Sequence, residues 1–87
     1  MKKLICMVTG ATDGIGKAVA KAIAQRGDTL LIVGRDSNKT ETVLKEIVDF
    51  SSNADVEYFI ADLSSQKQVR ALSGLVQSKY PKLDVLV

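Results

Sequence analysis

The stretch Val8–Lys17 reads VTGATDGIGK and holds three glycines within seven residues, between an apolar run and an alanine-rich one. A strand that enters a glycine-rich turn and continues as a helix bares the N–H groups of the helix start, where the macrodipole favours an anion. The stretch therefore predicts a pyrophosphate-binding turn. It is not a Walker loop, because Ala18 stands where a magnesium-binding Ser or Thr is needed. A plain strand–helix turn remains the alternative at this point.

Apolar runs and helical patterns alternate along the rest of the chain. The runs predict buried strands over residues 4–8, 29–33, 56–61 and 83–87. Apolar residues with helical spacing predict helices between them, ended by Gly27, by the turn at residues 51–53 and by Pro81. The fold class is therefore α/β, a Rossmann-type doubly wound parallel sheet truncated after its fourth strand, in the order 3-2-1-4.

Capping signals mark the starts of the second and third helices. One of three neighbouring side chains can cap the second helix: Asp36, Ser37 or Asn38. Glu41, three residues after Asn38, could complete a capping box there. Ser65 and Gln68 predict a capping box at the third helix.

Composition narrows the class of protein. Hydrophobic residues make up 46% of the chain, which indicates a packed globule, and a net charge of +2 with few aromatics argues against nucleic-acid binding. The sequence contains no histidine, which excludes catalysis by histidine and metal sites with histidine ligands. Its one cysteine, Cys6, is expected to be a buried thiol. The apolar run after Lys2-Lys3 is too short for a signal peptide or a membrane span, so a cytoplasmic location without membrane contact is expected.

The segment Leu83–Val87 predicts how the chain relates to a complete domain. It is an apolar strand former with no turn, helix or polar tail behind it. A self-contained domain rarely ends inside a strand, because an unpaired edge is left. Residues 1–87 are therefore expected to be the N-terminal, mononucleotide-binding half of a dinucleotide-binding domain, without its catalytic half. The exposed strand edge is expected to favour self-association.

The end of the second predicted strand bears on which dinucleotide binds. Dinucleotide sites often place an acid there to hold the ribose hydroxyls, but this strand ends in Gly34 and Arg35. Gly34 brings no carboxylate to repel a 2′-phosphate, and Arg35 brings a guanidinium that can pair with that phosphate and stack on adenine. NADP is therefore expected in preference to NAD, with a solvated Arg35 as the alternative.

These segments together resemble the short-chain dehydrogenase/reductase family. Thr9-Gly10-x-x-x-Gly14-Ile15-Gly16 resembles the family's TGxxxGIG fingerprint, and Gly34-Arg35-Asp36, Asp62-Leu63 and Leu83–Val87 follow at similar spacing. The resemblance implies an NADP-dependent oxidoreductase that transfers a hydride between a nicotinamide cofactor and an alcohol or carbonyl substrate.

The resemblance also implies roles for single residues. The glycines and Ile15 match the pyrophosphate loop, and Thr9 matches a residue whose hydroxyl braces that loop. Arg35 matches the 2′-phosphate partner of NADP-preferring members. Asp62 matches the acid that binds the adenine amino group, with the Leu63 backbone beside it, although an N-cap role fits Asp62 equally well. The predicted cofactor-binding residues are Thr9, Gly10, Thr12, Asp13, Gly14, Ile15, Gly16, Arg35, Asp62 and Leu63.

Asp13 departs from many NADP-dependent members, which carry a basic residue directly before the second glycine. The departure leaves Arg35 as the main expected ligand of the 2′-phosphate.

The family's chemistry needs an Asn-Asn-Ala-Gly segment, a catalytic Asn and Ser, and a Tyr-x-x-x-Lys pair. Four residues after Tyr58 and Tyr80 stand Asp62 and Asp84, so both tyrosines are expected to be packing residues. No catalytic residue is predicted, and the isolated chain is expected to be inactive, with substrate bound only by the complete enzyme. Two other hypotheses are a stand-alone nucleotide-binding or regulatory module and a functionless, self-associating fragment.

Overall fold

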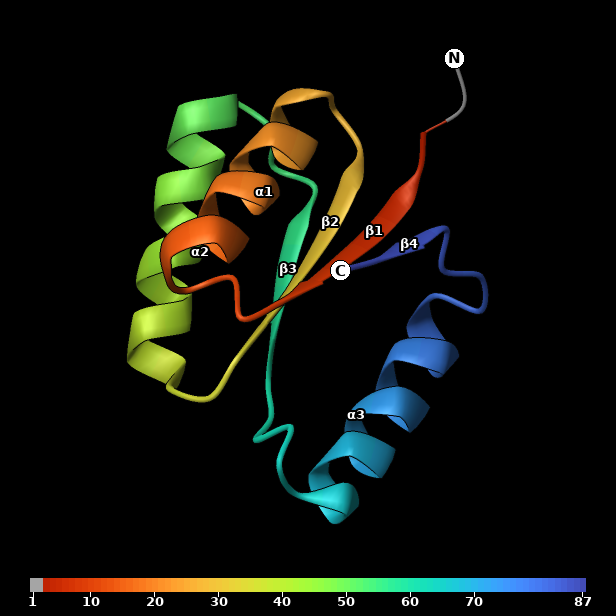
Figure 1. Ribbon diagram of the computed structural model, residues 1–87. Coiled ribbons are helices and arrows are strands. Elements are labelled where there is room, and N and C mark those ends of the chain that lie inside the picture. Colours follow the sequence, from red (N-terminus) through yellow and green to blue (C-terminus); the bar gives the residue numbers. More distant parts are fainter. Residues whose placement is uncertain (1–2) are drawn as a thin grey trace.

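The computed structural model describes residues 3–87, in which four parallel strands lie in the order β3-β2-β1-β4 (Figure 1). The strands are β1 (Ile5–Thr9), β2 (Thr29–Gly34), β3 (Val56–Ile60) and β4 (Val85–Leu86). The helices are α1 (Gly14–Gln25), α2 (Ser37–Ser51) and α3 (Gln66–Lys79). The predicted fold class and strand order are confirmed.

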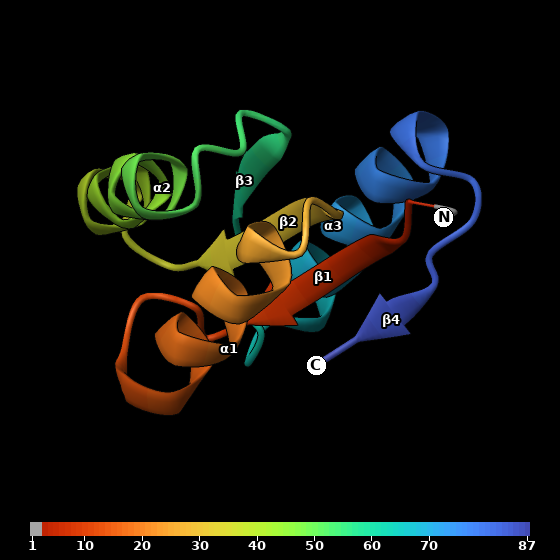
Figure 2. The same cartoon turned by 90° about the horizontal axis from the view of Figure 1, so that it is seen from above.

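The central strand β2 is buried along its whole length because helices cover both faces of the sheet. Figure 2 shows α1 and α2 on one face and α3 on the other. Successive strand residues point to opposite faces, so Leu30 and Ile32 pack with the α1 and α2 side, while Leu31 and Val33 pack with Val76 of α3. This two-sided burial explains why the strands read as continuous apolar runs.

The helix caps agree with the sequence only in part. Asp36 is the N-cap of α2, and its carboxylate accepts a hydrogen bond from the Lys39 backbone N–H at 3.1 Å. The predicted capping box between Asn38 and Glu41 is wrong, because the helix has already begun at Ser37.

The predicted capping box of α3 is half formed. The Ser65 hydroxyl accepts from the Gln68 N–H at 3.3 Å, as expected of an N-cap. The Gln68 side chain does not return to Ser65: its Oε1 accepts from the Asp62 N–H at 2.6 Å. Gln68 therefore fixes the loop between β3 and α3, at the edge of the sheet where the strands end.

Cys6 is fully buried and free, as expected, and burial raises the pKa of its thiol. Within residues 3–87, no helix has the length and apolar character needed to cross a membrane. The same residues contain no cluster of acidic and cysteine side chains suited to a metal ion.

Candidate functional site

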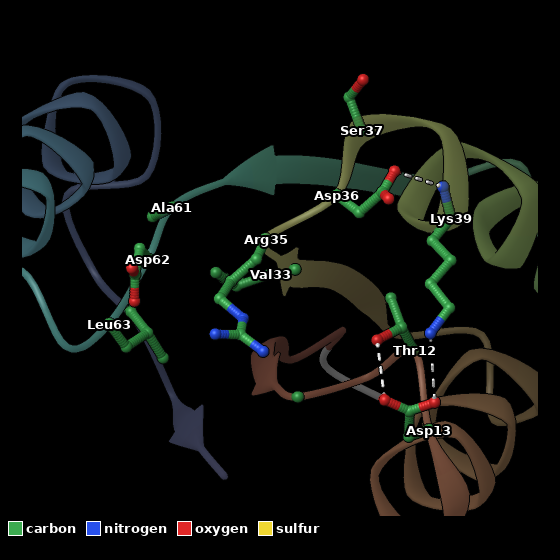
Figure 3. A pocket seen from close by; sticks show the side chains of 12 residues that line it. Thr12, Asp13, Val33, Arg35, Asp36, Ser37, Lys39, Ala61, Asp62 and Leu63 are labelled. Atoms are coloured by element: carbon green, nitrogen blue, oxygen red, sulfur yellow. Dashed lines mark hydrogen bonds and ion pairs between the residues drawn. The ribbon is translucent and has the colours of Figure 1, made fainter.

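A cleft of about 970 Å³ lies where β1, β2 and β3 end at their carboxyl termini (Figure 3). Parallel strands bring these ends to one edge of the sheet, which is where open α/β sheets bind ligands. The lining residues come from the end of β2, from the loops after the three strands and from the start of α2: Gly10, Thr12, Asp13, Val33, Gly34, Arg35, Asp36, Ser37, Lys39, Ala61, Asp62 and Leu63.

The loop between β1 and α1 needs its glycines for two different reasons. Gly10 and Gly14 have φ angles of 63° and 47°, in the left-handed region that side chains disfavour. A Cβ on Gly16 would overlap with the carbonyl oxygen of Gly10, so the first turn of α1 packs directly on the loop backbone. Asp13, the N-cap residue, gives this helix start no side-chain hydrogen bond within the described chain. The first N–H groups of α1 are therefore left to an anion or solvent.

Arg35 lies in the middle of the cleft. In Figure 3 its guanidinium lies between Asp62 and Leu63 on one side and Thr12 and Lys39 on the other. Arg35 is the one arginine among the lining residues, and its guanidinium is always charged. A guanidinium can bind a phosphate group with two N–H donors at once.

Gly34, directly before Arg35, is also required for a steric reason, apart from its lack of charge. A Cβ there would overlap with the Thr40 hydroxyl oxygen and lie 3.1 Å from Cγ2 of Thr12. Thr40 is fully buried and donates its hydroxyl to the Asp36 carbonyl at 2.7 Å, so it cannot easily move aside. With α2 packed on β2 as it is here, any side chain at position 34, an acid included, would overlap with Thr40.

Asp62 forms the opposite wall of the cleft. Its Oδ1 accepts from the Ser64 hydroxyl at 2.7 Å and from the Ser64 backbone N–H at 3.0 Å. These two bonds, with the nearby charge of Arg35, lower the pKa of Asp62, so it is ionised at neutral pH. The N-cap of α3 is Ser65, so the alternative role of Asp62 as N-cap is wrong. A fixed, ionised acceptor at this place suits an amino group.

Six of the ten predicted site residues line the cleft, and four do not. Gly14 and Gly16 shape the loop, and Ile15 presents a side chain that is 84% exposed. The Thr9 hydroxyl donates to the Val87 carbonyl at 2.9 Å, so it ties β1 to the end of β4.

Six lining residues lie outside the predicted set, and Lys39 is the basic one among them. It lies in the first turn of α2, and its Nζ is 3.8 Å from Oδ1 of Asp13 in the glycine loop. The position of Lys39 in the sequence could have indicated this contact. The helix that follows β2 starts at the same sheet edge as the glycine loop, so its first turn faces that loop.

Neither Tyr58 nor Tyr80 lines the cleft. The Tyr80 hydroxyl donates to Oε2 of Glu57 at 2.8 Å, and burial together with this bond raises the pKa of Tyr80 to about 12. A tyrosine acting as general base near neutral pH needs a lowered pKa instead. Tyr58 is partly buried against the cluster under α1 and α2, so its predicted packing role is confirmed.

Comparison with known proteins places this geometry in a family. The family model for short chain dehydrogenases matches residues 4–87. A 3beta-hydroxysteroid dehydrogenase of Mediterraneibacter gnavus is 40% identical over 83 residues, which are 95% of this chain and 29% of that protein.

Two solved structures, of a reductase and of an oxidoreductase, have a similar fold. YwfH, an NADPH dependent reductase involved in bacilysin biosynthesis, superposes with a TM-score of 0.91 at 32% identity, over 98% of this chain and 36% of that one. A metagenomic short-chain oxidoreductase in complex with NADP gives a TM-score of 0.86 at 31% identity, over 95% of this chain and 37% of that one. The chain thus spans between 29% and 37% of the length of these relatives. It belongs to the short-chain dehydrogenase family.

Proposed function

We propose that residues 3–87 form the adenosine and pyrophosphate half of an NADP(H) site in a short-chain reductase. The observation that carries the proposal is the Arg35 guanidinium, which lies in a cleft bounded by the glycine loop on one side and by Asp62 on the other. The chain corresponds in this proposal to the mononucleotide-binding half of the dinucleotide domain.

The residues present fit the cofactor group by group. The pyrophosphate would lie against the first turn of α1, where a Cβ on Gly16 would displace the loop backbone. The adenine amino group would meet the ionised carboxylate of Asp62. The 2′-phosphate would meet Arg35, beside a position that packing keeps free of any carboxylate. Preference for NADP(H) over NAD(H) follows from this last pair.

The wider reaction is proposed from the family. When bound, the cofactor would supply a hydride for exchange with an alcohol or carbonyl carbon of a small-molecule substrate. Residues 3–87 would bind and orient its adenosine end, and they are expected to be inactive alone, because neither Tyr58 nor Tyr80 is followed four residues later by a lysine.

Arg35→Ala tests the proposal with ligands that need only this half of the site. NMR titration of the chain should show that 2′,5′-ADP loses affinity by about 1.5–3 kcal/mol, the range for hydrogen bonds to a charged group, or roughly tenfold to more than a hundredfold. The affinity for 5′-AMP, which lacks the 2′-phosphate, should change little.

Arg70→Ala is the matched control, since it removes the same charge from the exposed surface of α3. It should leave both affinities near those of the unaltered chain. Equal losses for the two ligands in Arg35→Ala would show that Arg35 does not read the 2′-phosphate, and a folded chain that binds neither ligand would refute the proposed function.

We also propose that the chain self-associates through the outer edge of β4. This strand is the last in the sheet order, and Leu86 within it is 66% exposed. An apolar edge strand with free backbone groups is a template for pairing. Light scattering should give a mass that rises with concentration, and Leu86→Lys should reduce that rise. A constant monomer mass would contradict the proposal.

A further inference from the structure

Lys39 and Asp13 face each other across the mouth of the cleft, from two elements that the chain folds together. Figure 3 shows the Lys39 side chain extended from the first turn of α2 toward the glycine loop, where its ammonium meets the Asp13 carboxylate. The two atoms are 3.8 Å apart, and the side chains are 64% and 81% exposed. An ion pair this long and this exposed to water is weak and can exchange partners.

The other acids of the cleft are held by different donors. Asp36 accepts the Lys39 backbone N–H at the helix start, and Asp62 accepts two bonds from Ser64. Apart from Lys39, the partner of Asp13 recorded within residues 3–87 is the Thr12 hydroxyl, at a long 3.5 Å. Lys39 is therefore the cation that Asp13 holds, and it lines the same cleft as Arg35.

We propose that the Asp13–Lys39 pair is a latch that competes with the 2′-phosphate for Lys39. This inference rests on the proposed function. When the 2′-phosphate binds beside Arg35, Lys39 leaves Asp13 and becomes a second phosphate ligand. A phosphate monoester carries about 1.5–2 negative charges and three acceptor oxygens, so it is a stronger partner than one exposed carboxylate. The long flexible stem of lysine allows the change of partner.

The latch explains how the site can work with an acid in the glycine loop. Lys39, from the first turn of α2, supplies the second positive charge that the loop itself lacks. Asp13 then lowers the affinity for the 2′-phosphate by occupying Lys39 in the free chain. Both residues determine specificity through the phosphate group alone, and 5′-AMP should be largely indifferent to them.

NMR titrations of the full chain with 2′,5′-ADP and 5′-AMP test the latch. Lys39→Gln should weaken 2′,5′-ADP by roughly fivefold to tenfold, as expected for the loss of a charge-assisted contact, and change 5′-AMP by less than about twofold. Lys45→Gln is the matched control, because it removes the same charge from α2 at a residue that pairs with Glu41 outside the cleft. It should change neither affinity by more than about twofold.

Asp13→Asn supplies the second arm. It should tighten 2′,5′-ADP by roughly threefold, with Asp49→Asn as the control for net charge. In the Lys39→Gln background the same change should bring little gain, since the two residues then no longer compete. General repulsion of phosphate by Asp13 would instead tighten 5′-AMP as well and persist without Lys39, and that result would overturn the latch.

Failure of the latch and failure of the proposed function give different results. If Lys39→Gln behaves like Lys45→Gln while Arg35→Ala still loses 2′,5′-ADP selectively, the latch is wrong and the proposed function stands. If the folded chain binds neither ligand, the proposed function fails and the latch with it.

Discussion

Gly16→Ala is expected to lower the free energy of unfolding by about 3 kcal/mol or more, at the upper end for overpacking of a close-packed site. The added Cβ would overlap with the carbonyl oxygen of Gly10 and lie 2.9 Å from its carbonyl carbon. Both atoms belong to the backbone, so no side-chain rotation relieves the contact. Either α1 moves off the loop or the loop moves out of the cleft.

Urea unfolding followed by circular dichroism measures this loss. A chain of this length is expected to have a free energy of unfolding of roughly 4–13 kcal/mol, so a loss of this size is readily detected. Any folded fraction of the variant should also bind 5′-AMP more weakly, because the displaced loop no longer presents the first turn of α1 to the phosphate.

Gly74→Ala is the matched control for Gly16→Ala. Gly74 lies inside α3, and outside its chain neighbours and its own helix backbone a Cβ there would meet no atom of the described chain within 4 Å. The substitution should therefore raise the free energy of unfolding by about 0.5–1 kcal/mol, because alanine favours helix over glycine. Wild-type stability in Gly16→Ala would show that the loop backbone yields easily and would contradict the packing argument.

Features set by local pattern were predictable from the sequence. The runs at β1 and β2 are continuously apolar, so that both faces of each strand carry apolar side chains. They predicted a sheet covered on two sides, and the structure confirms it. Gly27 follows the end of α1 with a φ of 86°, as expected of a C-terminal glycine. Such signals depend on neighbours within a few residues of the chain.

Features that depend on a second element were not predictable in the same way. Gly34 was interpreted through its missing charge, while the structure adds the contact with Thr40, which depends on how closely α2 packs on β2. The contact of Lys39 with Asp13 joins residues 26 positions apart across the cleft, so no local pattern predicts it. The sequence also allowed Asp62 to cap α3, but the helix begins at Gln66 and Ser65 is its N-cap.

Asn53 shows the same limit and supports a second large effect. The sequence placed it in a plain turn, but its side chain joins three segments. Its Nδ2 donates to the Ala24 carbonyl at 3.0 Å and to the Asp28 carbonyl at 2.9 Å, and its Oδ1 accepts from the Asp55 N–H at 2.9 Å. The end of α1 and the turn before β2 are thereby tied to the loop before β3.

Asn53→Ala is expected to lower the free energy of unfolding by about 2–4 kcal/mol, because three hydrogen bonds are lost, two of them partly buried. Asn38→Ala is the matched control on the exposed first turn of α2 and should change stability by no more than about 0.5 kcal/mol. Denaturant unfolding under identical conditions compares the two variants. Equal stabilities would mean that solvent replaces the Asn53 bonds at no cost.

Asn53→Asp separates loss of the donors from loss of the side chain's shape. The carboxylate keeps the acceptor for the Asp55 N–H but directs a negative charge at the carbonyls of Ala24 and Asp28. Repulsion by these two oxygens should raise the pKa of the new carboxyl group above its value in the unfolded chain. The folded state then binds the proton more tightly than the unfolded state, so the variant should recover stability relative to Asn53→Ala as the pH falls through that raised pKa. Since the protonated carboxyl can donate one of the two missing bonds, recovery should be partial. A stability difference between the two variants that does not change from pH 7 to pH 4 would show that the Asn53 side chain does not face these carbonyls in solution.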